Sequence, residues 1–155
     1  MSQHEHIALK KRLRQHCIAI IEQRIATTLV VMNNAQAAAN NEEKSSAGDK
    51  YETGRAMGHL EKDMHASQLA ANRKELAALL TVDCNTPHST VTTGSLINCG
   101  NISFFIAAGL GKIHFEAKDI FLLSPVAPMA MTLRNKKAGD IIVFNNKSML
   151  VETIC

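Results

Sequence analysis

Four acidic residues lie close together before the middle of the chain. Glu42, Glu43, Asp49 and Glu52 fall within eleven residues of sequence. Asp49 and Glu52 are three residues apart, so on a helix their carboxylates share one face of a single turn. Carboxylate oxygens are preferred ligands of a hard cation such as Mg²⁺, but two carboxylates leave most of its octahedral shell open. The spacing therefore predicts either a cation site that a partner completes or a helix cap beside a solvated loop.

A basic run near the N-terminus is the second charged cluster. It comprises Lys10, Lys11, Arg12 and Arg14. Clustered Lys and Arg side chains can neutralise the phosphates of a nucleic acid, which makes RNA a candidate partner for this run. The same pattern is also typical of the solvated face of a surface helix, and the sequence leaves both interpretations open.

The histidines and cysteines do not form a metal-binding motif. His59 with Asp63, and Glu61 with His65, are spaced to share faces of one predicted helix. A di-metal site in a helix bundle needs Glu-x-x-His pairs from two helices, and the first helix offers only Glu22 in its middle. No two of the four cysteines are spaced as Cys-x-x-Cys, so we expect free, scattered thiols. Serine-nucleophile and phosphate-loop motifs are also absent from the sequence.

Length and composition exclude several classes of protein. The chain has 155 residues and a net charge of +3, which indicates one domain or two small ones and does not by itself indicate nucleic acid. Aromatic residues make up only 4%, which argues against a large aromatic-lined pocket. No apolar run approaches the roughly 18 residues of a membrane span, and the N-terminus lacks the apolar core of a signal peptide. We therefore expect a cytoplasmic protein with no membrane partner.

Proline and glycine divide the chain into two halves. Residues 1–86 contain no proline, and residues 1–47 contain no glycine. All three prolines and five of the eight glycines come after residue 86. This distribution predicts helices first, then strands and turns. Helical periodicity runs over about 5–43 and again over about 50–80. The short polar loop between these segments predicts an antiparallel hairpin, with Asp49 as the N-cap of its second helix.

The second predicted helix carries a line of apolar and small residues at alternating spacings of three and four. Such a line is typical of a coiled-coil seam. Because it is rich in Ala and Met, each contact would bury little area. The hairpin is therefore expected either to stand alone or to form half of a four-helix bundle that dimerisation completes. The line comprises Met57, Leu60, Met64, Ser67 and Ala71.

The expected fold class is α+β, with a helical hairpin over 1–82 and a small sheet domain over 83–155. We expect few contacts across the boundary between them. Ser124 and Pro125 predict the N-cap and first turn of a short helix after a strand, and Asn145–Asn146 predicts a tight hairpin. The domain is expected to be an antiparallel sheet of four or five strands with one helix over it. Strands are predicted over 91–97, 101–108, 119–123, 140–144 and 148–154.

Two segments carry a resemblance to a known family. Residues 47–52, Ala-Gly-Asp-Lys-Tyr-Glu, resemble the Gly-Asp-x-x-Glu tip motif of the Gre family of bacterial transcript-cleavage factors. Residues 124–127, Ser-Pro-Val-Ala, followed by Gly139–Asp140 and a β-branched run, resemble the C-terminal signature of that family. The order and separation of both segments match, and the resemblance spans nearly the whole chain. It implies an N-terminal antiparallel coiled coil followed by an FKBP-like domain.

The resemblance also implies a partner and a role for each cluster. Members of the family bind RNA polymerase through the C-terminal domain, and their hairpin enters the secondary channel. The tip acids, here Asp49 and Glu52, help to hold a second Mg²⁺ so that the polymerase cuts backtracked RNA. On this basis the chain is no enzyme on its own, binds no cofactor when free, shares Mg²⁺ only with the polymerase and has no small-molecule substrate. Polymerase contacts are expected at Ser124, Pro125, Val126 and Ala127, and contacts to the RNA 3′ segment or channel rim at Lys10, Lys11, Arg12 and Arg14.

Three alternatives stand beside this interpretation. The residues after Glu52 are Thr53-Gly54-Arg55-Ala56, where the family commonly has Asn-Ala-Glu/Asp-Tyr, so a cation replaces a third acid. A Gre-like channel binder that regulates or inhibits polymerase without stimulating cleavage fits this change. A self-associating helical scaffold fits the hairpin alone. A prolyl isomerase fits poorly, because residues 83–155 contain no Trp or Tyr to line its pocket.

Overall fold

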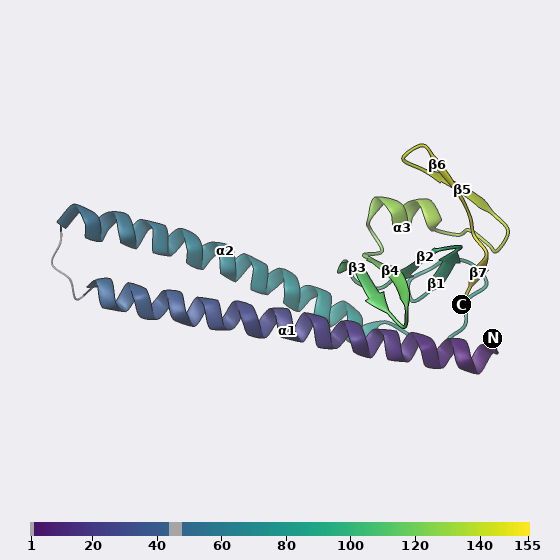
Figure 1. Cartoon of the computed structure of the whole chain (residues 1–155), viewed down its shortest axis with the longest axis horizontal. Coiled ribbons are helices and arrows are strands. Elements are labelled where there is room, and N and C mark those ends of the chain that lie inside the picture. The colour runs from purple at the N-terminus through teal and green to yellow at the C-terminus, as the bar shows by residue number, and fades with distance from the viewer. Residues whose placement is uncertain (1, 44–47) are drawn as a thin grey trace. The chain divides into compact units, whose positions relative to one another are not determined.

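Two long helices open the chain, as the sequence predicts. The computed structural model describes residues 2–43 and 48–155, without the side chains of residue 39 and of residues 41–55. Helix α1 spans Gln3–Glu43 and helix α2 spans Gly48–Thr81 (Figure 1). The absence of proline from both segments allows the backbone hydrogen bonds to continue without a break.

The remainder of the chain is a small sheet domain with one short helix, which confirms the α+β class. Strand order in the main sheet is β3-β4-β2-β1-β7, and β5 with β6 forms a separate two-stranded sheet. Strands β2 and β4 run parallel, whereas the other pairs are antiparallel. The strands are β1 Leu96–Cys99, β2 Ile102–Ile106, β3 Gly111–Phe115, β4 Lys118–Leu123, β5 Ile141–Phe144, β6 Lys147–Leu150 and β7 Thr153–Ile154, and helix α3 is Pro128–Leu133.

Several details of the sheet differ from the prediction. The segment predicted as one strand over 148–154 is divided between β6 and β7, which belong to separate sheets. The parallel β2–β4 pair also departs from the antiparallel sheet that was predicted. Strand β3 was not predicted, because the turn that pairs it with β4 is Glu116–Ala117, which lacks the usual Asn or Gly although both residues have positive φ. The strand predicted over 91–97 begins only at Leu96. Gly94 has a φ of +91°, and a Cβ there would lie 2.6 Å from the Asp83 carbonyl oxygen, so the chain turns sharply before the strand. The predicted Asn145–Asn146 hairpin is confirmed, with both residues at positive φ.

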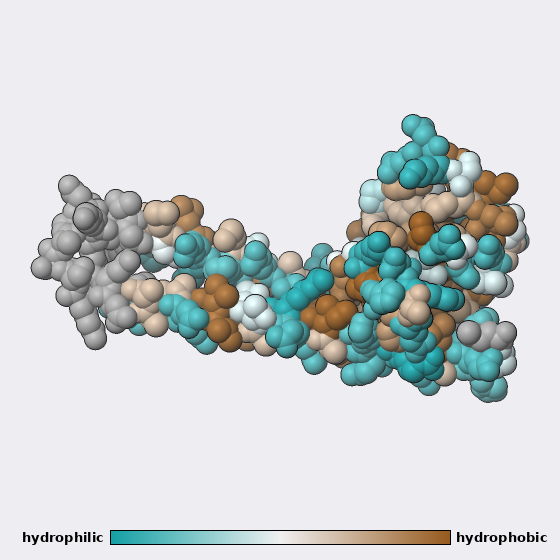
Figure 2. All heavy atoms as spheres, in the orientation of Figure 1, coloured by the Kyte–Doolittle hydropathy of each residue, from teal (hydrophilic) through white to brown (hydrophobic). Residues whose placement is uncertain are grey.

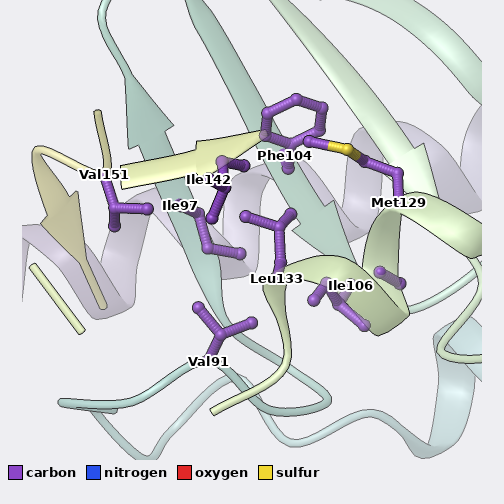
Figure 3. Packing of buried hydrophobic residues seen from close by; sticks show 9 residues of the cluster. Val91, Ile97, Phe104, Ile106, Met129, Leu133, Ile142 and Val151 are labelled. Carbon is purple, nitrogen blue, oxygen red and sulfur yellow. The ribbon is translucent and has the colours of Figure 1, made fainter. Parts of the chain in front are cut away.

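The main core of the sheet domain lies between one face of the sheet and helix α3. Ile97 and Phe104 are paired across β1 and β2, so their side chains share that face. Strand β5 closes the core through Ile142 (Figure 3). The buried cluster comprises Val91, Ile97, Phe104, Ile106, Met129, Ala130, Leu133, Ile142 and Val151.

The start of α1 packs with the opposite face of the same sheet. The ring centroids of His16 and Phe115 are 5.0 Å apart, and Leu9 of α1 lines one cavity together with Leu96 of β1. The structure accordingly divides into two compact units, residues 1–19 with 75–155, and residues 20–74. This division differs from the predicted boundary at residue 82, because the first turns of α1 and the last turn of α2 belong with the sheet.

The hairpin unit, residues 20–74, uses a different seam from the predicted one. Met57, Leu60 and Met64 are 60%, 70% and 53% exposed, whereas Leu69 is buried. The inner line of α2 is shifted by one residue and runs through Gly58, His65, Leu69, Asn72, Leu76 and Leu79. The predicted line was therefore wrong between Met57 and Ala71. The pattern was also expected to close with Leu76, Leu79 and Leu80, of which Leu79 is fully buried and Leu80 is 58% exposed.

The observed burial on α2 predicts a large loss of stability from truncating one leucine and almost none from truncating another. Leu69→Ala should lower the free energy of unfolding by about 2–4 kcal/mol, because it removes buried methyl groups and leaves a gap. Leu60→Ala is the matched control and should change it by less than about 0.5 kcal/mol. Urea unfolding followed by circular dichroism measures both changes. A larger loss from Leu60→Ala would mean that the predicted seam, and not the observed one, faces α1.

Candidate functional site

The acidic tip motif lies where α2 begins. The helix starts at Gly48, one residue before the predicted cap, and it includes Asp49 and Glu52 in its first turn. The predicted cation pair, the capping box and the neighbouring Arg55 all depend on side chains outside the described residues. The structure does show that both acids lie at the N-terminal end of α2, which is the positive end of the helix dipole. That dipole stabilises carboxylates and so competes with a bound cation.

The basic run is not a free phosphate-binding surface. Lys10 is 0% exposed, and its Nζ donates to the Thr86 carbonyl oxygen at 3.0 Å. Arg14 donates from Nη1 to the Val82 carbonyl oxygen at 3.2 Å. Arg12 pairs with Glu116 in the β3–β4 turn, with 2.8 Å between Nε and Oε1. Because Lys10 is buried, it is not available for the expected contact with RNA or the channel rim. Arg12 and Arg14 instead bond to groups of this chain. Three of the four cations tie α1 to the sheet domain, and Lys11 is exposed.

Burial sets the protonation of the groups around Lys10. Desolvation lowers the pKa of Lys10, while the nearby thiols of Cys155 and Cys84 and the Asp83 carboxylate act in the opposite direction. Burial raises the pKa of Cys17 to about 12, with a smaller contribution from Cys84. The pKa of Cys84 is also raised by its burial, against the opposing effect of Arg14 and Lys10. All four cysteines are free thiols, and these shifts favour their protonated, unreactive form.

The histidine and acid pairs on α2 remain separate from one another. His59 and Asp63 are exposed, while the Nδ1 atom of the half-buried His65 lies 3.3 Å from Oε1 of Gln68. In the part of the chain that the structure describes, no group of three or more His, Cys, Asp or Glu side chains converges on one point. The described helices also contain no stretch with the length and hydropathy that crossing a bilayer requires.

The Ser124–Ala127 segment forms an exposed turn in front of α3. The Ala127 amide donates to the Ser124 carbonyl oxygen at 3.0 Å, and the Val126 amide donates to Ser124 Oγ at 3.4 Å. The N-cap of α3 is Ala127, and Pro128 occupies the first turn. The prediction of Ser124 as cap and Pro125 as first turn was therefore wrong by one turn. Pro125 and Pro128 are both suited to the first turn of a helix. Residues 124–127 form a tight turn, so the helix begins at Pro128.

One face of the β5–β6 hairpin is apolar and exposed. Ile141 and Leu150 are paired across the two strands, and Val143 lies two residues farther along β5, so the three side chains share a face. All three are at least half exposed, whereas Ile142 on the other face is buried in the core. We call Ile141, Val143 and Leu150 the outer face. Figure 2 shows hydrophobic surface on this hairpin beside its hydrophilic tip.

Sequence reasoning identified the Ser124–Ala127 segment but missed the outer face. It predicted β5 and β6 as strands without distinguishing their two sides, because both sides carry apolar residues. Val126 is 79% exposed, and Met131 of α3 is also exposed. The cations Arg134, Lys137 and Lys147, exposed on the same C-terminal part of the chain, add positive charge to it. The comparisons with known proteins do not assign this surface: no family model, no curated protein and no solved structure matches the chain.

The environment of Lys10 predicts a pH-dependent difference in stability. Its pKa is lower in the folded protein than in the unfolded chain, so between these two values the unfolded state binds more protons. Folding stability from this group therefore rises with pH across that window, which ends near 10.5. Relative to Lys10→Met, which cannot titrate, the wild type should gain stability between pH 7 and pH 10.

Urea unfolding of both proteins at each pH measures this difference, and the comparison cancels the other titrating groups that the two chains share. The control variant Lys11→Met removes the exposed neighbour but keeps Lys10, so its stability should depend on pH as that of the wild type does. An identical pH dependence for Lys10→Met and the wild type would contradict the burial of Lys10.

Proposed function

We propose that this chain is a Gre-like elongation factor that binds bacterial RNA polymerase. In this proposal the hairpin enters the secondary channel, and the tip acids assist the cleavage of backtracked RNA by the polymerase. The observation that carries the proposal is the architecture of the hairpin unit. Two helices of 41 and 34 residues are joined at a tip that bears the Gly-Asp-x-x-Glu motif. An α-helix of 34 residues is about 50 Å long.

The sparse burial along the hairpin supports a role in reaching a distant site. Within the described part of residues 20–74, only Ile21, Thr28 and Leu69 are buried. Thr28 is polar, and its hydroxyl donates to the Arg24 carbonyl oxygen of its own helix at 2.9 Å. A pair of helices that encloses so little apolar surface contributes little to a core. Its length is better explained by a role of the tip than by a contribution to a core.

The chemistry assigned to the tip follows from its two acids. Asp49 and Glu52 are too few to hold Mg²⁺ alone, and the helix dipole further weakens their hold on a cation. Inside a polymerase that supplies other oxygen ligands, the same pair can complete the shell of a second ion. A second ion stabilises the attacking and leaving oxygens of phosphodiester cleavage. The chain's own residues then contribute ligands and position, while the polymerase performs the reaction.

The outer face and the Ser124–Ala127 turn are the proposed docking surface. Apolar side chains that are exposed together typically mark a binding site. Basic residues on the same part of the chain favour a partner patch that is apolar at its centre and acidic at its rim. Docking through the sheet domain leaves the tip free, so binding and cleavage should respond to different substitutions.

A cleavage assay on a stalled, backtracked elongation complex tests the proposal. The wild type should shorten the RNA. Asp49→Asn combined with Glu52→Gln should bind equally well but stimulate cleavage at least tenfold less, because a Mg²⁺ ligand pair is lost. Val143→Asp should lose both binding and cleavage. Ala117→Asp is its matched control, since it adds the same charge in the exposed β3–β4 turn.

The regulatory alternative gives a different pattern in the same assay. Wild type that binds polymerase without shortening the RNA would favour a channel-binding inhibitor, and Arg55→Glu should then gain activity. Failure of the wild type to bind polymerase at all would refute both interpretations.

A second candidate function is self-association through the hairpin. Met57, Leu60 and Met64 are exposed on α2, and Leu29, Val30 and Val31 are exposed on α1. Scattered apolar residues are common on surfaces, but six within one helical pair are compatible with half of a larger bundle.

Light scattering of the full chain over a range of concentrations distinguishes the two functions. A factor that inserts its hairpin into a channel should be monomeric. A dimer that Leu60→Lys with Met64→Lys dissociates would instead support the helical scaffold.

A further inference from the structure

A cavity of about 470 Å³ lies between the start of α1 and the face of the sheet opposite α3. His6, Leu9 and Arg12 line it from the helix. Strands β1, β2, β4 and β7 line it from the sheet, together with the end of β3 and its turn. All of these residues belong to the compact unit of 1–19 and 75–155. Its volume falls within the range of about 300–1,000 Å³ that small-molecule sites occupy.

The floor of the cavity carries a row of polar side chains. Asn98 of β1 is paired with Ser103 of β2 on one side and with Thr153 of β7 on the other. Directly paired residues share a face, so the three side chains form one row across three adjacent strands. A sheet face packed against a helix is normally apolar, and the neighbouring Leu96 and Ile120 follow that rule.

One member of this row lacks a hydrogen-bond partner. The Oδ1 atom of Asn98 is buried and accepts no hydrogen bond from any described residue. Ser103, which is directly paired with Asn98, is only 8% exposed. Leaving buried polar groups unpaired costs stability, so each such group calls for an explanation.

The walls and rim of the cavity complete a site with two kinds of surface. Leu9, Leu96, Phe115 and Ile120 supply apolar walls, and His16 holds the Phe115 ring in place. At the rim, Glu116 pairs with Arg12, and the exposed Lys118 also lines the cavity. The interior therefore offers apolar contact for the body of a ligand and neutral hydrogen-bonding groups for its head.

We propose that this cavity binds a small uncharged amphiphile whose head group is a primary amide or an alcohol. Such a head donates to Asn98 Oδ1, which pairs that acceptor, and accepts from the Ser103 hydroxyl. A carboxylate head would leave Asn98 Oδ1 unpaired, because it has no hydrogen to donate. The apolar body would lie between Leu9 and Phe115. This site is independent of the polymerase proposal, because it uses neither the tip nor the outer face.

A titration of the ¹⁵N-labelled full chain with 4-butylbenzamide tests the proposal. Saturable shifts should appear in the backbone amides of Leu96, Ser103 and Thr153 and in the side-chain amide of Asn98. Two related probes isolate the head group. Both 4-butylbenzoate, with a charged head, and butylbenzene, with none, should bind about tenfold more weakly, the effect expected from unpaired polar groups. Equal affinity for the three probes, or no saturable binding, would overturn the proposal and leave the cavity to water.

Two variants separate binding from a structural role. Asn98→Val should raise the melting temperature of the free protein, because it removes an unpaired buried acceptor, and it should abolish the preference for the amide. Ser103→Ala should weaken amide binding several-fold with little change in melting temperature. Ser148→Ala, on the outer side of the β5–β6 hairpin, should change neither quantity. If Asn98→Val lowers the melting temperature and Ser103→Ala leaves affinity unchanged, the polar row supports the fold and the proposed site is wrong.

Discussion

The burial of Lys10 is the constraint on which the arrangement of the sheet unit depends. An ammonium group without solvent exposure is stable only when it is hydrogen-bonded and near opposite charge. Here it has the Thr86 carbonyl oxygen and the Asp83 carboxylate. Asp83 is in turn fixed by hydrogen bonds from Thr86 and Asn85, which lower its pKa. These contacts hold the segment after α2 against α1, so the connection to the sheet domain is structured and is no free linker.

The contacts of the basic run lie within the sheet unit. Lys10, Arg12 and Arg14 contact three separate positions of the same unit, so their charge serves cohesion within it. The Arg12 pair with Glu116 is exposed and contributes little by itself. It nevertheless fixes the turn that follows Phe115, a wall of the cavity. The same anchoring therefore shapes both the first turns of α1 and the cavity that contains the unpaired Asn98 Oδ1.

Several features of the fold follow directly from the sequence, and the exceptions have physical reasons. The first 86 residues, which contain no proline, hold both long helices, and Asn145–Asn146 is a hairpin because these residues tolerate positive φ. Strand β3 escaped prediction because Glu116–Ala117 adopts the same turn without the usual residues. The seam on α2 was misplaced by one residue because the apolar side chains of Met57, Leu60 and Met64 follow coiled-coil spacing although they are exposed. For the candidate site, the sequence indicated the tip and the Ser124–Ala127 turn, whereas exposure of the outer face is visible only once strand register is known.

Few residues are buried between the two long helices, whereas the start of α1 is well packed. The cooperativity of helix formation explains how both can occur in one helix. Starting a helix is costly, whereas extending one is nearly free for residues of high helical propensity. Helix α1 is held at its start by Leu13 and Cys17, which are fully buried, and from there it continues into a run ending in Ala37-Ala38-Ala39, the residue with the highest helical propensity. A hairpin that extends from a packed base does not need a large apolar interface of its own. Its inner line can then include Gly58, His65 and Asn72, none of which buries a large apolar side chain.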